Sequence, residues 1–155
     1  MSMVDISDKA ITKRVACADG RIVFSAKAFK ILIKQGSPKG NIFETAKVAG
    51  IMAAKNTPAL IPLCHPLLLE KVQVTFEILK SKHTVKITSQ VSCSGKTGVE
   101  MEALAAVSAA CLTIYDMMKF SGQDMTITDI RLMHKSGGKS GLHTRHSLKL
   151  GVYTR

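Results

Sequence analysis

Three ionisable side chains share one stripe of the long, otherwise apolar segment 94–120. Asp116 and Lys119 are three residues apart, which places them on one face of a helix. Glu102, fourteen residues before Asp116, projects within about 40° of the same line. A carboxylate held beside an amine can move protons on a substrate, and the same pair on a solvated helix edge would be an ordinary ion pair. Buried charges are costly unless they are paired or face a polar pocket, so the apolar surroundings make such a pocket as plausible as an ion pair on a solvated edge. Both interpretations stay open.

Two further sites could do chemistry before this segment. Lys39 lies in the turn 37–40 ahead of an expected helix, so it is either a solvated lysine or an ammonium suited to a phosphate. Cys64 and His65 lie between two prolines in the apolar run 60–69. They point to opposite sides of an extended chain, so they cannot form a catalytic pair with each other. His65 is therefore either a core histidine or part of the wall of a rigid binding site.

Two short Gly-Lys loops, Gly95-Lys96-Thr97 and the segment 135–141 (KSGGKSG), resemble phosphate-binding loops. Both lack the first glycine of a P-loop, because Gln90 and Met133 stand there. The sequence thus argues against a P-loop ATPase, although both loops can offer backbone N–H groups to anions.

The elements that must position these residues follow from periodicity and turn signals. We expect a hairpin over 14–25 turning at Asp19-Gly20, helices over 25–35 and 42–55, paired strands over 71–80 and 83–93, and a last strand over 123–134. Thr97 and Glu100 have the spacing of a capping box at the start of the long helix. The order predicts an α+β protein with a ferredoxin-like antiparallel sheet and helices on one face. The open face of such a sheet favours an oligomer.

Size and composition predict one domain, residues 1–141, which the resemblance given below implies to be catalytic, followed by a basic tail, residues 142–155. We expect no membrane span or export signal, and the four scattered cysteines are typical of a reducing, cytoplasmic compartment. The net charge of +11 suits nucleic acid, a membrane surface or a polyphosphorylated small molecule. Only 5% of the residues are aromatic and no nucleic-acid-binding motif occurs, which argues against nucleic acid. A nucleic-acid module is therefore kept as the alternative hypothesis only.

Four strings, LCHP, GKTGVEMEAL, LTIYDM and KSGGKSG, occur in this order. Over residues 3–141 the chain closely resembles the cyclic pyranopterin monophosphate synthases, the molybdenum cofactor biosynthesis protein C family. The resemblance implies a lyase that converts (8S)-3',8-cyclo-7,8-dihydroguanosine 5'-triphosphate to cyclic pyranopterin monophosphate and pyrophosphate. It also implies a ferredoxin-like subunit and a hexamer, a trimer of dimers, with each active site at a dimer interface.

The resemblance assigns expected roles residue by residue. Asp116 and Lys119 look like the acid/base pair, and Lys39 looks like the third catalytic group. The expected substrate contacts are Leu63, Cys64, His65, Met101, Glu102, Glu100, Lys135 and Arg14. Glu100 ranks below Glu102 because capping alone would explain it. No cofactor and no protein metal site are expected.

Three hypotheses follow: the lyase, a nucleic-acid module and a catalytically inactive structural partner in a cofactor-assembly complex. The lyase needs Asp116, Lys119 and Lys39 for turnover but not for folding. A nucleic-acid module would bind oligonucleotides with a steep salt dependence and would tolerate loss of Asp116.

Overall fold

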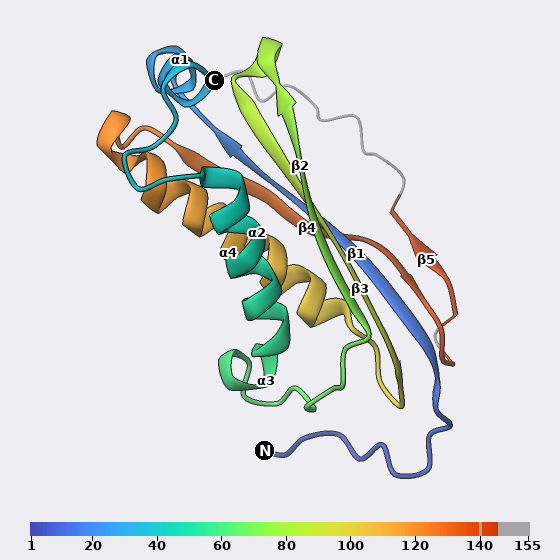
Figure 1. Cartoon of the computed structure of the whole chain (residues 1–155). Coiled ribbons are helices and arrows are strands. Elements are labelled where there is room, and N and C mark those ends of the chain that lie inside the picture. Colours follow the sequence, from blue (N-terminus) through green and yellow to red (C-terminus); the bar gives the residue numbers. More distant parts are fainter. Residues whose placement is uncertain (140, 146–155) are drawn as a thin grey trace.

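One antiparallel sheet forms the frame of the molecule (Figure 1). The computed structural model describes residues 1–139 and 141–145. The strands are β1 (Thr12–Val23), β2 (Lys71–Leu79), β3 (Thr84–Gly95), β4 (Thr126–Ser136) and the short β5 (His143–Thr144). Their order across the sheet is β2-β3-β1-β4-β5. Because β1 lies between β3 and β4 and every pair is antiparallel, the first four strands have the ferredoxin-like arrangement, which confirms the predicted fold class.

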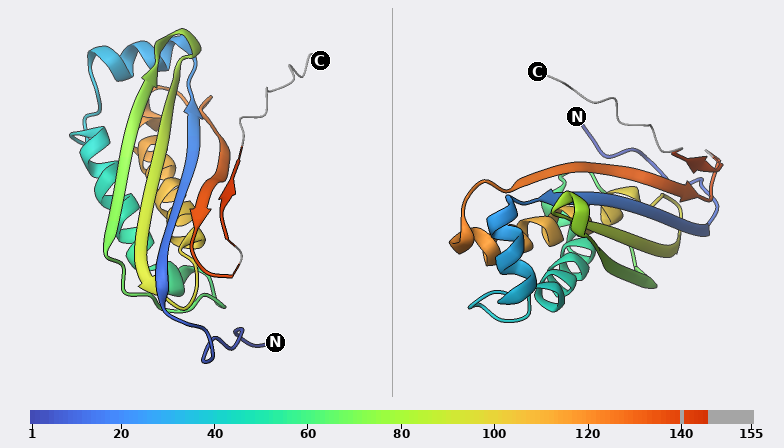
Figure 2. Two further views of the ribbon diagram at one scale, coloured as in Figure 1. Left: turned by 90° about the vertical axis from the view of Figure 1, so that its right-hand side faces the viewer. Right: turned by 90° about the horizontal axis from the view of Figure 1, so that it is seen from above.

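The helices gather on one side of this sheet, as the view from above in Figure 2 shows. They are α1 (Ala26–Lys34), α2 (Ile42–Lys55), α3 (Thr57–Leu60) and α4 (Glu100–Met118), with short 3-10 turns η1 (Lys80–Lys82) and η2 (Lys119–Ser121). Side chains cap two of these helices: Ser25 Oγ accepts from the Ala28 amide at 3.3 Å, and Asn41 Oδ1 accepts from the Glu44 amide at 3.1 Å. These side chains satisfy N–H groups that the first helical turn leaves free.

The central helix α4 packs on β1, β3 and β4 on one side and on α2 on the other. Small residues allow this close approach, because a Cβ at Gly50 of α2 would lie only 2.9 Å from the Ala106 carbonyl of α4. The length and apolar composition of α4 would also fit a membrane span, but Ala103, Ala110 and Ile114 are completely buried inside the fold. Burial on two sides accounts for its composition.

Two local predictions were wrong. Asp19-Gly20 does not turn, since β1 runs straight through it and pairs with both neighbours. Gly20 instead leaves room for the Val107 side chain of α4, and the buried Asp19 carboxylate accepts a hydrogen bond from Arg131 Nε at 3.0 Å. Asp and Gly are typical of turns, but in this strand the glycine allows close packing and the aspartate forms an ion pair.

The predicted capping box is also absent. The helix starts at Glu100, its N-cap is Val99, and among the described residues no side chain caps it. The Glu100 carboxylate pairs with Lys135 instead, at 2.8 Å. A distant cation thus replaces the local backbone partner that the spacing of Thr97 and Glu100 suggested.

The last strand begins three residues after the start of the expected 123–134 and ends two residues beyond it, and β5 pairs with it inside the expected tail. Residues 146–155 of that tail lie outside the described residues. The boundary between residues 141 and 142 stays a prediction.

Candidate active site

A carboxylate held between two ammonium groups lies at the C-terminal end of α4. Asp116 Oδ1 is 2.8 Å from Lys119 Nζ, and Asp116 Oδ2 is 2.6 Å from Lys39 Nζ. Each of the three side chains is about half exposed, at 50–55%. The structure therefore brings the three predicted catalytic residues together on an open surface, where a ligand or a second subunit can reach them.

The loop that carries Lys39 is fixed to this helix end. Ser37 Oγ donates to the Met117 carbonyl at 2.7 Å and accepts from the Lys39 amide at 3.2 Å. Gly40, at φ +107°, closes the small loop with a backbone bond to Ser37. One serine thus satisfies a terminal carbonyl of α4 and positions the lysine loop.

Mutual attraction keeps this cluster charged. Hydrogen bonds from Lys119 and then Lys39 lower the pKa of Asp116 to about 2, and the bond to Asp116 raises the pKa of Lys119. Attraction to the carboxylate therefore outweighs burial for Lys119, which sequence alone left open. The cluster carries a net positive charge at neutral pH and suits an anionic substrate.

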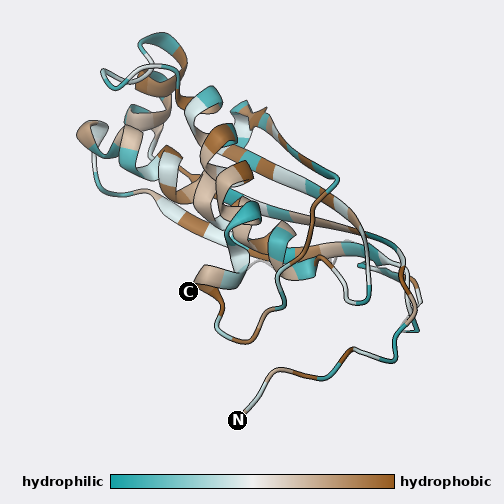
Figure 3. Cartoon of the chain, turned by 60° about the horizontal axis from the view of Figure 1, so that its bottom comes forward, coloured by the Kyte–Doolittle hydropathy of each residue, from teal (hydrophilic) through white to brown (hydrophobic). Residues whose placement is uncertain are grey.

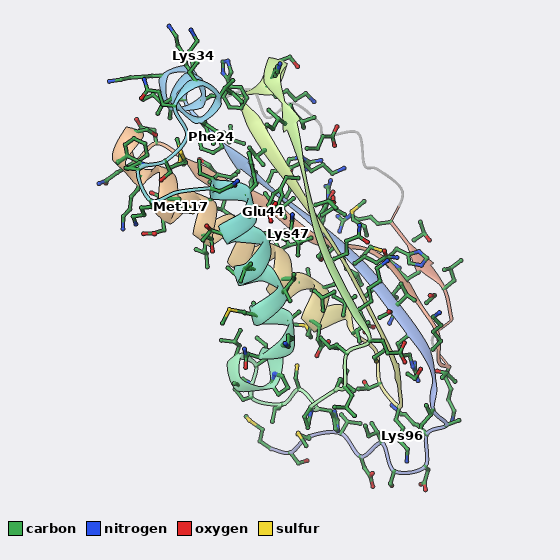
Figure 4. The ribbon with its side chains drawn as sticks, in the orientation of Figure 1. Phe24, Lys34, Glu44, Lys47, Lys96 and Met117 are labelled. Atoms are coloured by element: carbon green, nitrogen blue, oxygen red, sulfur yellow. The ribbon has the colours of Figure 1, made fainter. Side chains whose placement is uncertain are left out.

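Glu102 lies far from this cluster. Fourteen helical residues at 1.5 Å each separate it from Asp116 by about 21 Å along α4. Met117, beside Asp116, and Lys96, near the start of α4, mark opposite ends of the molecule in Figure 4. Asp116 and Lys119 are in contact, but within one chain Glu102 does not line a pocket with them.

A cavity of about 430 Å³ lies beside the N-terminal end of α4. Its walls include six predicted substrate contacts: Leu63, Cys64, His65, Glu100, Met101 and Glu102. Glu102 is 3% exposed, and burial followed by repulsion from Glu100 raises its pKa. Burial also raises the pKa of the Cys64 thiol, which disfavours a nucleophilic thiolate. These properties fit recognition of a ligand better than covalent catalysis.

A second, basic cavity of about 540 Å³ adjoins the first and contains both Gly-Lys loops. Lysine and arginine side chains predominate among its charges: Lys9, Arg14, Lys96, Lys135 and Lys139, with Glu100 as the acid. Arg14 donates from Nε to the Gly95 carbonyl at 3.2 Å and from Nη2 to the Lys96 carbonyl at 3.3 Å. A Cβ at Gly138 would overlap the Arg14 guanidinium, so this glycine lets the second loop approach.

Arg14 and Lys135 therefore lie together as predicted, but Lys39 is at the other end of the same chain. Sequence reasoning did not select Lys9, which lines both cavities. It lies in a polar lead-in without periodicity, and its position follows only from how residues 1–11 cross the fold.

Comparison with known proteins identifies the family. The model of the MoaC family matches residues 3–138. The chain belongs to the MoaC family. A cyclic pyranopterin monophosphate synthase of Parvibaculum lavamentivorans is 52% identical over 139 residues, covering 90% of this chain and 87% of the relative. Proteins of the same name from Methylobacterium nodulans (53% identical; 92% of this chain, 89% of the relative) and Campylobacter lari (52%; 92% and 91%) are equally similar.

These findings confirm the predicted family, its role in molybdenum cofactor biosynthesis and the lyase class. The roles of individual site residues stay predictions.

Proposed function

We propose that this chain is a cyclic pyranopterin monophosphate synthase that converts (8S)-3',8-cyclo-7,8-dihydroguanosine 5'-triphosphate to cyclic pyranopterin monophosphate and pyrophosphate in the cytoplasm. The observation that carries the proposal is the contact of Lys39 and Lys119 with the two oxygens of Asp116 in a chain more than half identical to synthases of this name.

The cluster supports acid/base chemistry. Asp116 is ionised at neutral pH and can accept a proton, while the neighbouring Lys119 ammonium can donate one. Rearrangement of a purine-derived ring requires protons to move on nitrogen and oxygen, and closure of a cyclic phosphate places new negative charge where an ammonium can stabilise it. We assign catalysis to Asp116, Lys119 and Lys39.

The two cavities support a division of binding between base and phosphates. The apolar walls and the buried Glu102 of the smaller cavity suit a flat ring with hydrogen-bond donors. The basic cavity with Arg14, Lys135 and the two Gly-Lys loops suits a triphosphate, because each cation can form charge-assisted hydrogen bonds with phosphate oxygens.

Geometry favours a site shared between subunits. A proton moves only over hydrogen-bond distance, so the Asp116 cluster cannot act on a ligand atom held about 21 Å away beside Glu102 of the same chain. Large apolar side chains are exposed near the small cavity, including Leu60, Leu63 and Leu68. We propose a hexamer, built as a trimer of dimers, in which one subunit of a dimer supplies the cavities and its neighbour supplies the cluster.

The test is turnover of the cyclic dihydro-GTP substrate, followed by pyrophosphate release and pterin formation. The intact chain should be active, and Asp116→Asn and Lys119→Met should be inactive while retaining the fold by circular dichroism. Lys80→Met, a matched lysine change in the distant η1 turn, should remain active. An intact, folded chain that releases no pyrophosphate would refute the proposal.

A further inference from the structure

Part of the N-terminal segment, between Val4 and Ala10, runs along both cavities. Val4, Ile6 and Lys9 line the smaller cavity, and Lys9 and Ala10 line the basic one. Figure 3 shows alternating hydrophilic and hydrophobic stretches along this segment. We call residues 4–10 the N-terminal strap; its side chains form one wall of the candidate substrate site.

The strap has its own local structure. The Asp5 carboxylate accepts from the Ser7 amide at 2.8 Å, and the Ile6 carbonyl accepts from the Lys9 amide at 3.1 Å. These bonds turn the Ser7 carbonyl toward the first Gly-Lys loop, where Lys96 Nζ donates to it at 2.5 Å. Lys96 lies next to the N-terminal segment in Figure 4. A lysine 89 residues away in sequence therefore ties the strap to the fold.

Lys96 has capacity for a second partner. An ammonium has three N–H donors, and within residues 1–139 and 141–145 its one hydrogen bond is to Ser7. Lys96 also lines the basic cavity, and Arg14 fixes its backbone through the Lys96 carbonyl. The ammonium can thus hold the strap and an anion in the cavity at the same time.

We propose that Lys96 is a positioning residue that bridges the N-terminal strap to a phosphate group in the basic cavity, so that phosphate binding fastens the strap over the site. The inference rests on the proposed function for the identity of the phosphate ligand. Lys9 reinforces the closure, because it is carried by the strap and lines both cavities, where the same anion attracts it.

Fastening the strap has a consequence for the reaction. The strap covers the junction of the two cavities, where Lys9, Thr97, Gly98 and Glu100 line both. Closure there excludes water from the bound substrate and strengthens its charge contacts. Because pyrophosphate is the leaving product, its departure from Lys96 would also release the strap.

The test measures hydrogen exchange of the N-terminal peptide by mass spectrometry in the full-length protein, with pyrophosphate as the probe and binding measured by calorimetry. Saturating pyrophosphate should slow exchange of the amides in residues 5–10 by about tenfold, the effect of one net charge-assisted hydrogen bond. Lys96→Met should remove this protection. Lys96→Arg should retain part of it, and Lys82→Met, a matched change in η1, should retain all of it.

Three results would overturn the inference: no binding of pyrophosphate, binding without slower exchange in the intact chain, or full protection in Lys96→Met. Turnover measured on the same samples separates this inference from the proposed function. Protection without turnover would refute the synthase and leave the strap, whereas turnover without protection would refute the strap alone.

Discussion

Replacement of Gly138 by alanine tests whether Arg14 organises the basic cavity. Gly138 has φ +73°, and a Cβ there would overlap the Arg14 guanidinium. The guanidinium is the end of a flexible side chain, so it can move aside, but it would then leave the Gly95 and Lys96 carbonyls. We expect Gly138→Ala to release the first Gly-Lys loop without unfolding the protein.

Gly141 provides the matched control. It has φ +63°, and a Cβ there would meet no atom of the described residues within 4 Å. Alanine at either position should cost about 1 kcal/mol of unfolding free energy, because both adopt a left-handed backbone conformation. Only Gly138→Ala displaces Arg14, and each hydrogen bond from a charged group contributes about 1.5 kcal/mol.

The assay is pyrophosphate affinity by calorimetry, with unfolding free energy measured by urea titration. Because the loop can relax in part, we expect the lost binding free energy to equal about one of the two Arg14 hydrogen bonds. Gly138→Ala should therefore bind pyrophosphate about tenfold more weakly than Gly141→Ala. Gly138→Ala should also be about 1.5 kcal/mol less stable than Gly141→Ala, the contribution of one such bond. Equal affinity in the two variants would refute the role assigned to Arg14.

Three further predictions concern charge and packing. The pKa of Asp116 is lowered from 3.8 to about 2, so the contribution of its ion pairs to stability is complete above pH 4 and is lost as the pH falls toward 2. Because Asp116 is then ionised throughout pH 5–9, Asp116→Asn should lower kcat/KM by at least about 100-fold over that whole range in pH-rate profiles. Burial raises the pKa of Glu102 above 4.5, so native stability should fall as the pH rises through 4.5 toward that value, and urea titrations of Glu102→Gln should show a smaller fall. Gly50→Ala should cost about 1–2 kcal/mol in the same titrations, because overpacking against the Ala106 carbonyl exceeds the gain in helix propensity; an unchanged midpoint would contradict the close α2–α4 contact.

Local signals in the sequence predicted most of the fold. The expected helices over 25–35 and 42–55 are present as α1 and α2, and the alternation in 71–80 and 83–93 predicts the β2–β3 hairpin. The errors come from residues whose local preference is overridden by distant partners. Gly20 makes room for Val107, and Glu100 pairs with Lys135.

The site was predicted only in part, again because partners distant in the sequence determine some of its contacts. Helical spacing correctly placed Asp116 beside Lys119, and the resemblance selected Lys39, which docks through Ser37. A helical wheel shows angle but not rise, so it grouped Glu102 with residues about 21 Å away. The sequence singled out the loop that carries Lys96 but not its contact with the strap, because Lys96 binds a backbone carbonyl, which no pattern of side chains reports.

The most direct test of the account is complementation between two inactive variants. Asp116→Asn removes the cluster, and Lys135→Met removes a cation of the basic cavity, which lies at the opposite end of the same chain. If neighbouring subunits build each site together, subunits unfolded and refolded as a mixture should recover turnover, because some interfaces then join an intact cluster to intact cavities. If each chain forms its whole site alone, the mixture should stay as inactive as its parts, and that result would contradict the shared site.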